Sequence, residues 1–208
     1  AAAAAGELPR IVEQRDLQGF LHCHTNYSDG STTVADWAAA CRAAGYRWVG
    51  ITDHSPSAVY AAGLAAEDIP RQHAEIDALN KISDEFRVLK GVEADILADG
   101  SLDYGPAVLE SFDFVIASIH TRFGMTEAQM TGRVLRAMDD PHLTILGHPT
   151  GRLLLTRDPY AIDLDRVLAR AAELGVAVEL NADPHRLDLD WRLVRKARDL
   201  GVAVSLGA

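Results

Sequence analysis

Residues 19–30, GFLHCHTNYSDG, bring two histidines and an aspartate into a turn at the end of a short apolar run. Successive side chains of an extended strand point to opposite faces, so we expect His22 and His24 to point one way and Cys23 the other. The polar segment that follows ends the strand and leaves Asp29 over the same end. Two imidazoles on one face are half of a metal site.

The composition is that of one domain of ordinary size. With 208 residues, 48% of them hydrophobic, the chain can build one sizeable core. No apolar run approaches the roughly 18 residues that a membrane span needs, and no leader opens the chain, so we expect a cytoplasmic protein with no membrane partner. Cys23 and Cys41 are predicted to be buried, reduced thiols. Residues 1–14, which begin with five alanines, are predicted to be a tail or linker, and 15–208 the domain.

The formal net charge of -10 argues against binding nucleic acid by charge alone, because that function needs a basic patch. A polyanionic substrate would need help from bound divalent cations or from another domain.

Apolar strands and helical patterns alternate along the chain. Strands are predicted around His22 and at 48–52, 86–96, 112–120, 143–149, 176–181 and 202–206. Helices are predicted after a cap at Thr32 or Thr33, over 67–85 and 126–138, and after caps at Asp163 and Asp190. Apolar strands separated by helices indicate a parallel sheet covered on both faces. Seven such units favour an α/β fold with a closed, TIM-like (β/α)7 barrel over a doubly wound sheet.

Metal-ligand residue types fall at the carboxyl ends of these strands, where barrel enzymes build their sites. Imidazoles mixed with carboxylates suit Zn, Mn or Fe, and there are too many for one tetrahedral ion, so a cluster of two or three ions is predicted. Glu93, between the histidine pairs, is the natural bridge and is assigned a catalytic role. The remaining histidines, His73, His142 and His185, are expected to be exposed. The strand-end residues are His22, His24, His54, Glu93, His120 and His148.

Several residues near these strand ends are further candidates. Arg152 follows HPTG and could clamp a phosphate, as a substrate-binding and catalytic residue, or form a structural salt bridge. Arg122 follows His120 and is a second substrate-binding candidate. Asn181 could line the pocket or satisfy loop amides, and Asp53 could face the barrel wall or orient a ligand.

Several motifs in a fixed order resemble the PHP (polymerase and histidinol phosphatase) family. They are GFLHCHTNYSDG, ITDHS, GVEADILADGSLDY, FVIASIH, ILGHPTGR and NADPHRLDL, and the similarity runs from about Arg15 to the end. It is greatest to the version at the C-terminus of bacterial family X DNA polymerases. The resemblance implies a distorted seven-stranded barrel with three metal ions and a manganese-dependent 3'-5' exonuclease. It also implies a single-stranded or gapped DNA 3' end as substrate, and an N-terminal polymerase domain in the same native chain.

The resemblance also implies a ligand assignment. It gives His22 and His24 to a first metal, His120 and His148 to a second, Asp29 and His54 to a third, and makes Glu93 the bridge. The family closes its first and third sites with an Asp-x-His just beyond the last strand, whereas this sequence stops at Ala208, where that motif would begin. We therefore expect the chain as written to be truncated, to hold at most one ion well and to be inactive. His185 stands where the polymerase-linked group is expected to have tyrosine.

Two alternatives to the exonuclease remain. One is a phosphomonoesterase like histidinol phosphatase, which the GSLDY and HPTGRLL strings disfavour by resemblance. The other is a structural PHP module that positions a polymerase domain, and the convergent ligand set argues against it, because a scaffold does not need one.

Overall fold

The barrel predicted from the alternating pattern is confirmed. A computed structural model describes residues 2–6 and 10–207. Within them, seven parallel strands close in chain order, so that β7 returns to β1. The strands are β1 (Gly19–Cys23), β2 (Trp48–Ile51), β3 (Arg87–Asp95), β4 (Phe114–Ser118), β5 (Leu143–Leu146), β6 (Ala177–Asn181) and β7 (Val204–Gly207).

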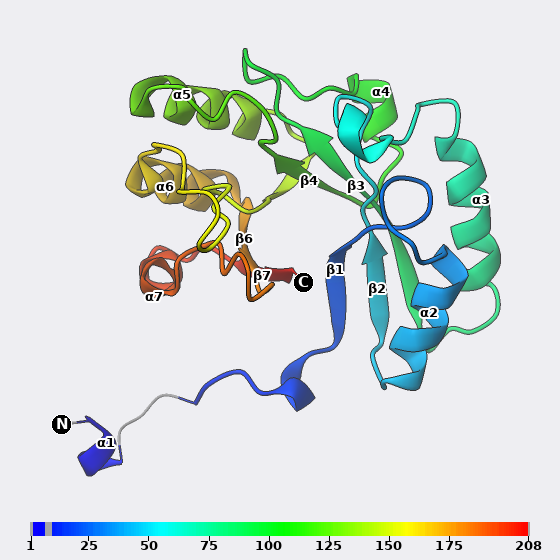
Figure 1. The fold of residues 1–208 in the computed structure, drawn as a ribbon. Coiled ribbons are helices and arrows are strands. Elements are labelled where there is room, and N and C mark those ends of the chain that lie inside the picture. Colours follow the sequence, from blue (N-terminus) through cyan, green and yellow to red (C-terminus); the bar gives the residue numbers. More distant parts are fainter. Residues whose placement is uncertain (1, 7–9, 208) are drawn as a thin grey trace.

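The helices lie outside the barrel. Figure 1 shows α2 and α3 on one side, and α5, α6 and α7 on the other, while the short α1 lies away from the barrel on the N-terminal segment. None of the helices in the described ranges is long and apolar enough to cross a membrane. The helices are α1 (Ala2–Ala5), α2 (Val34–Ala43), α3 (Ile69–Asn80), α4 (Pro106–Leu109), α5 (Glu127–Met138), α6 (Leu164–Leu174) and α7 (Trp191–Asp199), with 3-10 turns η1 (Gln14–Asp16) and η2 (Val59–Ala61).

Side-chain caps fix where several helices begin. Thr33, Asp163 and Asp190 each accept a hydrogen bond from a backbone N–H of the first turn, as predicted, and Thr126 does the same for α5. The predicted helix over 67–85 is shorter in the structure, because α3 begins at Ile69 beside Pro70 and ends at Asn80. Proline suits the first turn of a helix and fixes that start.

The core lies between the barrel wall and the outer helices. The strand residues Val92 and Val115 pack with Val134 of α5 and Leu168 of α6 in one buried cluster. Arg133 of α5 is fully buried and donates hydrogen bonds to backbone carbonyls in the loops after β3 and β4, those of Ile96, Leu97 and Thr121. These bonds tie α5 to the end of the barrel where the predicted ligands lie. Cys23 and Cys41 are buried free thiols, as expected.

Candidate metal centre

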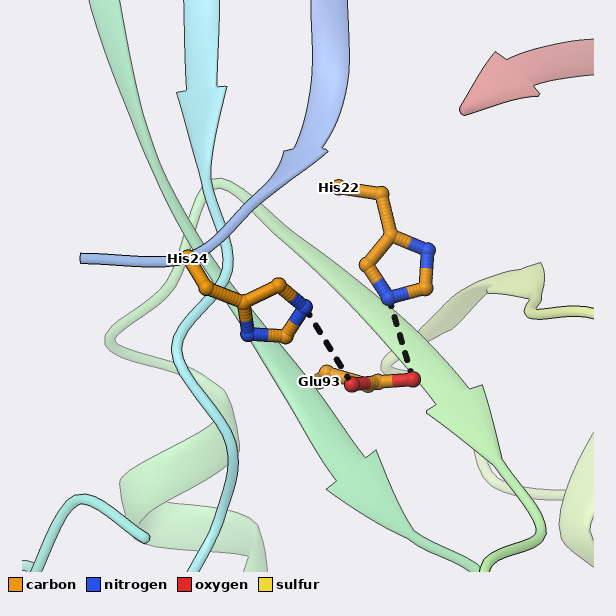
Figure 2. A group of neighbouring side chains, drawn as sticks. All are labelled: His22, His24 and Glu93. Atoms are coloured by element: carbon orange, nitrogen blue, oxygen red, sulfur yellow. Dashed lines mark ion pairs between the residues drawn. The ribbon is translucent and has the colours of Figure 1, made fainter. Parts of the chain in front are cut away.

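Five histidines surround the Glu93 side chain, which is only 1% exposed. Figure 2 shows His22 and His24 approaching its two carboxylate oxygens from the end of β1. The convergence predicted from the strand ends is therefore present. The distances from Glu93 are 3.0 Å (Oε1 to His22 Nε2), 3.0 Å (Oε1 to His148 Nε2), 3.3 Å (Oε1 to His120 Nε2), 2.8 Å (Oε2 to His54 Nδ1) and 3.7 Å (Oε2 to His24 Nε2).

Asp29 extends the cluster away from Glu93. Its two oxygens lie 3.7 Å from Nδ1 of His24 and 3.7 Å from Nε2 of His54. The ligand atoms form three overlapping groups, each with all its atoms within 4.8 Å of one another: His22, His24 and Glu93; His24, Asp29 and His54; and His54, Glu93 and His120. His24 and His54 thus each belong to two groups, whereas the resemblance implied one metal for each.

His22, in β1, and His24, just after β1, both reach Glu93, but not through the regular strand backbone that was predicted. His22 has φ of +65°, in the left-handed region that few non-glycine residues adopt, and the register with β2 shifts between Phe20 and Cys23. The expected simple alternation of a regular strand is therefore wrong here. The irregular backbone, with the Trp37 indole donating to the His24 carbonyl at 2.9 Å, sets both side chains toward Glu93.

The electrostatics of the cluster favour bound positive charge. Burial opposes ionisation of Glu93, but His22 and His120 outweigh it and hold the pKa of this carboxyl well below its usual range. Burial likewise opposes a charge on His120, yet Glu93 and Asp95 raise its pKa to about 9. His24 is different, because burial lowers its pKa to about 4 and Glu93 only partly offsets this. Metal-binding imidazoles must be deprotonated, so bound cations would compete with protons for these rings.

An unpaired polar atom shows that the cluster fits metal ions. Nδ1 of His24 is buried and has no hydrogen-bond partner in the described structure, and the nearest Asp29 oxygen lies 3.7 Å away. Buried polar atoms are normally paired, and a bound ion between this nitrogen and the carboxylate would satisfy both. Nitrogen and carboxylate oxygen donors suit Zn, Mn or Fe.

The comparison with known families decides where this chain belongs. The family model for the PHP domain matches residues 21–183, most of the chain. This chain belongs to the PHP domain family. The match contains all seven predicted ligands and ends just beyond β6.

Relatives and a solved structure agree with this assignment. The PHP domain chain is 44% identical to "DNA polymerase/3'-5' exonuclease PolX" of Bacillus subtilis over 194 residues, 93% of this chain but only 34% of that protein. It is 32% identical to the "Probable phosphatase" of Syntrophotalea carbinolica over 168 residues, 77% of this chain and 64% of that protein. Histidinol phosphate phosphatase from Lactococcus lactis, solved with zinc, L-histidinol and phosphate, shares the fold with a TM-score of 0.63 and 16% identity, covering 92% of this chain and 85% of its own.

Two buried carboxylates that the sequence analysis missed hold imidazoles of the PHP domain in place. Glu179 of β6 lies 2.5 Å from Nδ1 of His22 and accepts the backbone N–H of His148 at 2.6 Å. Asp95 of β3 contacts Nδ1 of His120. Both contacts leave Nε2 of the ring facing Glu93, as a carboxylate does when it orients a metal-binding histidine. A signal was present in the sequence, because a charge inside an apolar strand needs a partner.

Asp53 also acts behind the ligands, rather than as one of them. It is fully buried and accepts hydrogen bonds from the Thr25 N–H at 2.7 Å, from the Ser28 hydroxyl at 2.6 Å and from the Gln72 amide at 2.7 Å. These bonds fix the segment between His24 and Asp29, so the expectation that Asp53 orients a ligand agrees with its contacts.

A cavity lies beside the cluster, and only some of the predicted substrate-binding residues line it. Asn181 lines it, as expected, and its side-chain oxygen accepts the Asp183 N–H at 3.1 Å. Arg122 is exposed and lies outside the lining. Tyr60, Asp183 and Arg186 line it, although the sequence analysis did not select them.

Arg152 makes the structural salt bridge rather than the phosphate clamp. Its guanidinium pairs with Asp190 at 3.1 Å, donates to the Arg186 carbonyl at 3.0 Å and also donates to the Leu187 carbonyl. These contacts use three of its five N–H groups, and the residue does not line the cavity. Of the two roles expected for Arg152, its contacts are those of the structural salt bridge.

The three histidines outside the cluster differ in exposure. His185 is exposed as expected, with 85% of its side chain accessible. His73 and His142 are half-buried instead, because His73 packs edge-on against Phe112 and His142 pairs with Asp140 at 2.9 Å.

Arg152→Ala should therefore destabilise the protein without emptying the metal site. We expect a loss of about 1 kcal/mol in unfolding free energy, because a charged group that hydrogen-bonds half-buried and exposed partners is removed. Urea unfolding and elemental analysis measure the two effects. A loss of bound metal at unchanged stability would contradict this role.

Proposed function

We propose that this PHP domain is a metal-dependent phosphoesterase that removes nucleotides from the 3' end of DNA. The observation that carries the proposal is the set of five imidazoles around one buried carboxylate, together with the unpaired, buried Nδ1 of His24. Mn²⁺ is the proposed ion, in two or three copies, with Zn²⁺ or Fe²⁺ as alternatives. The assignment of His22, His24, Asp29, His54, Glu93, His120 and His148 as its ligands is part of the proposal.

The chain's own residues hold and orient the site. Glu93 has two oxygens that face different histidines, so it can join neighbouring groups, and Glu179 and Asp95 fix the rings of His22 and His120. Paired divalent ions supply an activated hydroxide and neutralise charge on the phosphoryl group in such enzymes. The cavity has a volume of about 240 Å³, below the roughly 300–1,000 Å³ of typical ligand pockets, which suits the end of a strand more than a duplex.

The DNA substrate is supported by the 44% identity to a protein named as a polymerase and 3'-5' exonuclease. This chain spans about a third of that relative, so a polymerase domain on the N-terminal side is proposed as its partner. The partner would also supply DNA affinity, since the net charge of -10 does not. DNA as substrate would place the protein in the cytoplasm, in DNA repair.

A phosphomonoesterase is the second candidate. The small cavity favours a compact ester, and the relatives include a "Probable phosphatase". The Lactococcus lactis enzyme of the same fold was solved with histidinol and phosphate. Tyr60 argues for the nucleic acid, because this residue is 67% exposed, its ring lies beside that of His54, and such a ring offers a face on which a base can stack.

One experiment separates the two. The chain as its gene encodes it, loaded with Mn²⁺, is given a 5'-labelled single-stranded oligonucleotide or histidinol phosphate. We expect a ladder shortened from the 3' end, no comparable release of phosphate, and loss of the ladder when a chelator removes the ion. Tyr60→Ala should raise the KM for the oligonucleotide about 5- to 100-fold, the range of one stacked base. Rapid histidinol phosphate hydrolysis without a ladder would favour the phosphomonoesterase.

A further inference from the structure

We propose that Arg186 binds a phosphate group of the substrate beside the metal centre. Arg186 lies in the loop after β6 and lines the same cavity as His22, Glu93 and His148. Its Nη1 atom is buried and has no hydrogen-bond partner in the described structure. The proposal rests on the proposed function and deepens it, by assigning the chain's own contact to the phosphoester.

The loop that carries Arg186 is held rigidly at the cavity edge. Its two ends are joined, because the N–H of Asn181 donates to the Asp188 carbonyl at 2.5 Å and the Asp188 N–H returns a bond at 3.2 Å. The Asp188 carboxylate accepts the Thr150 N–H at 3.0 Å. The loop is thus attached to the segment that follows β5.

Arg152 provides a second attachment of this loop. Its guanidinium donates to the backbone carbonyls of Arg186 itself and of Leu187, and Asp190 fixes the guanidinium from the other side. The arginine predicted to bind phosphate therefore supports the backbone of a second arginine, whose own side chain is left without an ion pair among the residues described. A guanidinium placed on a held backbone loses less freedom on binding than one on a mobile loop.

Charge and chemistry identify the ligand as an anion with several oxygens. Of the described residues that line the cavity, Arg186 is the only lysine or arginine, and the carboxylates of Asp29, Glu93 and Asp183 line it as well. Asp183 does not neutralise Arg186 by direct pairing, since its Oδ1 accepts the His185 N–H at 2.7 Å and contacts the His185 ring. The planar fork of a guanidinium matches two oxygens of a phosphate.

The test measures binding of inorganic phosphate to the Mn²⁺-loaded protein by calorimetry. Arg186→Gln should weaken binding about 10- to 100-fold, the size expected when a charged hydrogen-bond donor is lost. Arg186→Lys should recover part of the affinity, because it keeps the charge but not the planar pair of donors. Arg42→Gln makes the same charge change at an exposed position of α2 and should bind phosphate as the unaltered chain does.

Two further measurements keep the outcome interpretable. Bound manganese and the thermal midpoint should be the same in Arg186→Gln and Arg42→Gln, which excludes misfolding or metal loss as the cause. Phosphate affinity within twofold of the unaltered chain in Arg186→Gln would overturn the inference, even if DNA is still trimmed from its 3' end. Loss of phosphate affinity in a protein that trims no DNA would leave the Arg186 contact in place and reject the proposed exonuclease.

Discussion

Glu93→Gln should yield a folded protein that holds less than one metal ion per chain and has no measurable hydrolysis. Both oxygens of Glu93 face imidazoles, so one substitution removes the shared charge from two of the three ligand groups. Metal affinity should fall by more than about 100-fold, the upper end seen for residues that only orient a ligand. Elemental analysis after dialysis, together with the oligonucleotide assay, measures this.

Glu110→Gln is the matched control for Glu93→Gln, because it makes the same chemical change at an exposed position after α4. It should keep the metal content and activity of the unaltered chain. A full complement of ions in Glu93→Gln would reject Glu93 as the bridge.

Glu179→Gln should weaken metal binding about 10- to 100-fold although Glu179 is not among the proposed ligands. The carboxylate contacts Nδ1 of His22 and the N–H of His148, so its neutral replacement loosens two ligands together. Burial opposes the charge of Glu179, but His22 outweighs burial and holds the pKa of this carboxyl below its usual value. Competition with a chelator of known affinity measures the change.

Glu85→Gln, on the exposed segment before β3, is the control for Glu179→Gln. Equal metal affinity in the two variants would show that Glu179 serves packing alone. A displaced His22 ring in a structure of the Glu179 variant would support the positioning role.

The fold was predictable because its signals are local. Caps such as Thr33 and Asp163 and the left-handed Gly175 mark helix ends within a few residues, and continuous apolar strands mark burial on both faces. The helix predicted over 67–85 was too long, because its polar sequence has little helical periodicity to mark its ends. In the structure α3 ends at Asn80.

The site was predictable as far as barrel geometry dictates it. Parallel strands place their carboxyl ends at one face, which was enough to bring Glu93 and His120 together. The backbone of His22 was not predictable, because its left-handed conformation depends on an irregular pairing with β2. Glu179 meets His22 across 157 positions of sequence, and such a contact leaves no local pattern.

The choice between two arginines shows the same limit. Arg152 lies four residues after the predicted ligand His148, whereas no predicted ligand lies near Arg186 in the sequence, so proximity to a ligand favoured Arg152. In the structure it is Arg186, not Arg152, that lines the cavity. The loops that carry the two arginines have unusual backbone conformations, with Leu155 and Leu187 both at positive φ. Backbone conformations of that kind are set by tertiary contacts, such as the bond between the Leu154 N–H and the His185 carbonyl.

The closure of the barrel has a consequence for its stability. Strands β1 and β7 pair at one position, Leu21 with Gly207, whereas β6 and β7 pair at four. The His22 side chain spans this seam to reach Glu179 of β6. An ion held by His22 would therefore stabilise the pairing of β1 with β7. Its binding would raise the free energy of unfolding by about 2.7 kcal/mol when the free-ion concentration is 100 times the dissociation constant. The concentration of available metal would then determine the stability of the closed barrel as well as the rate of the proposed hydrolysis.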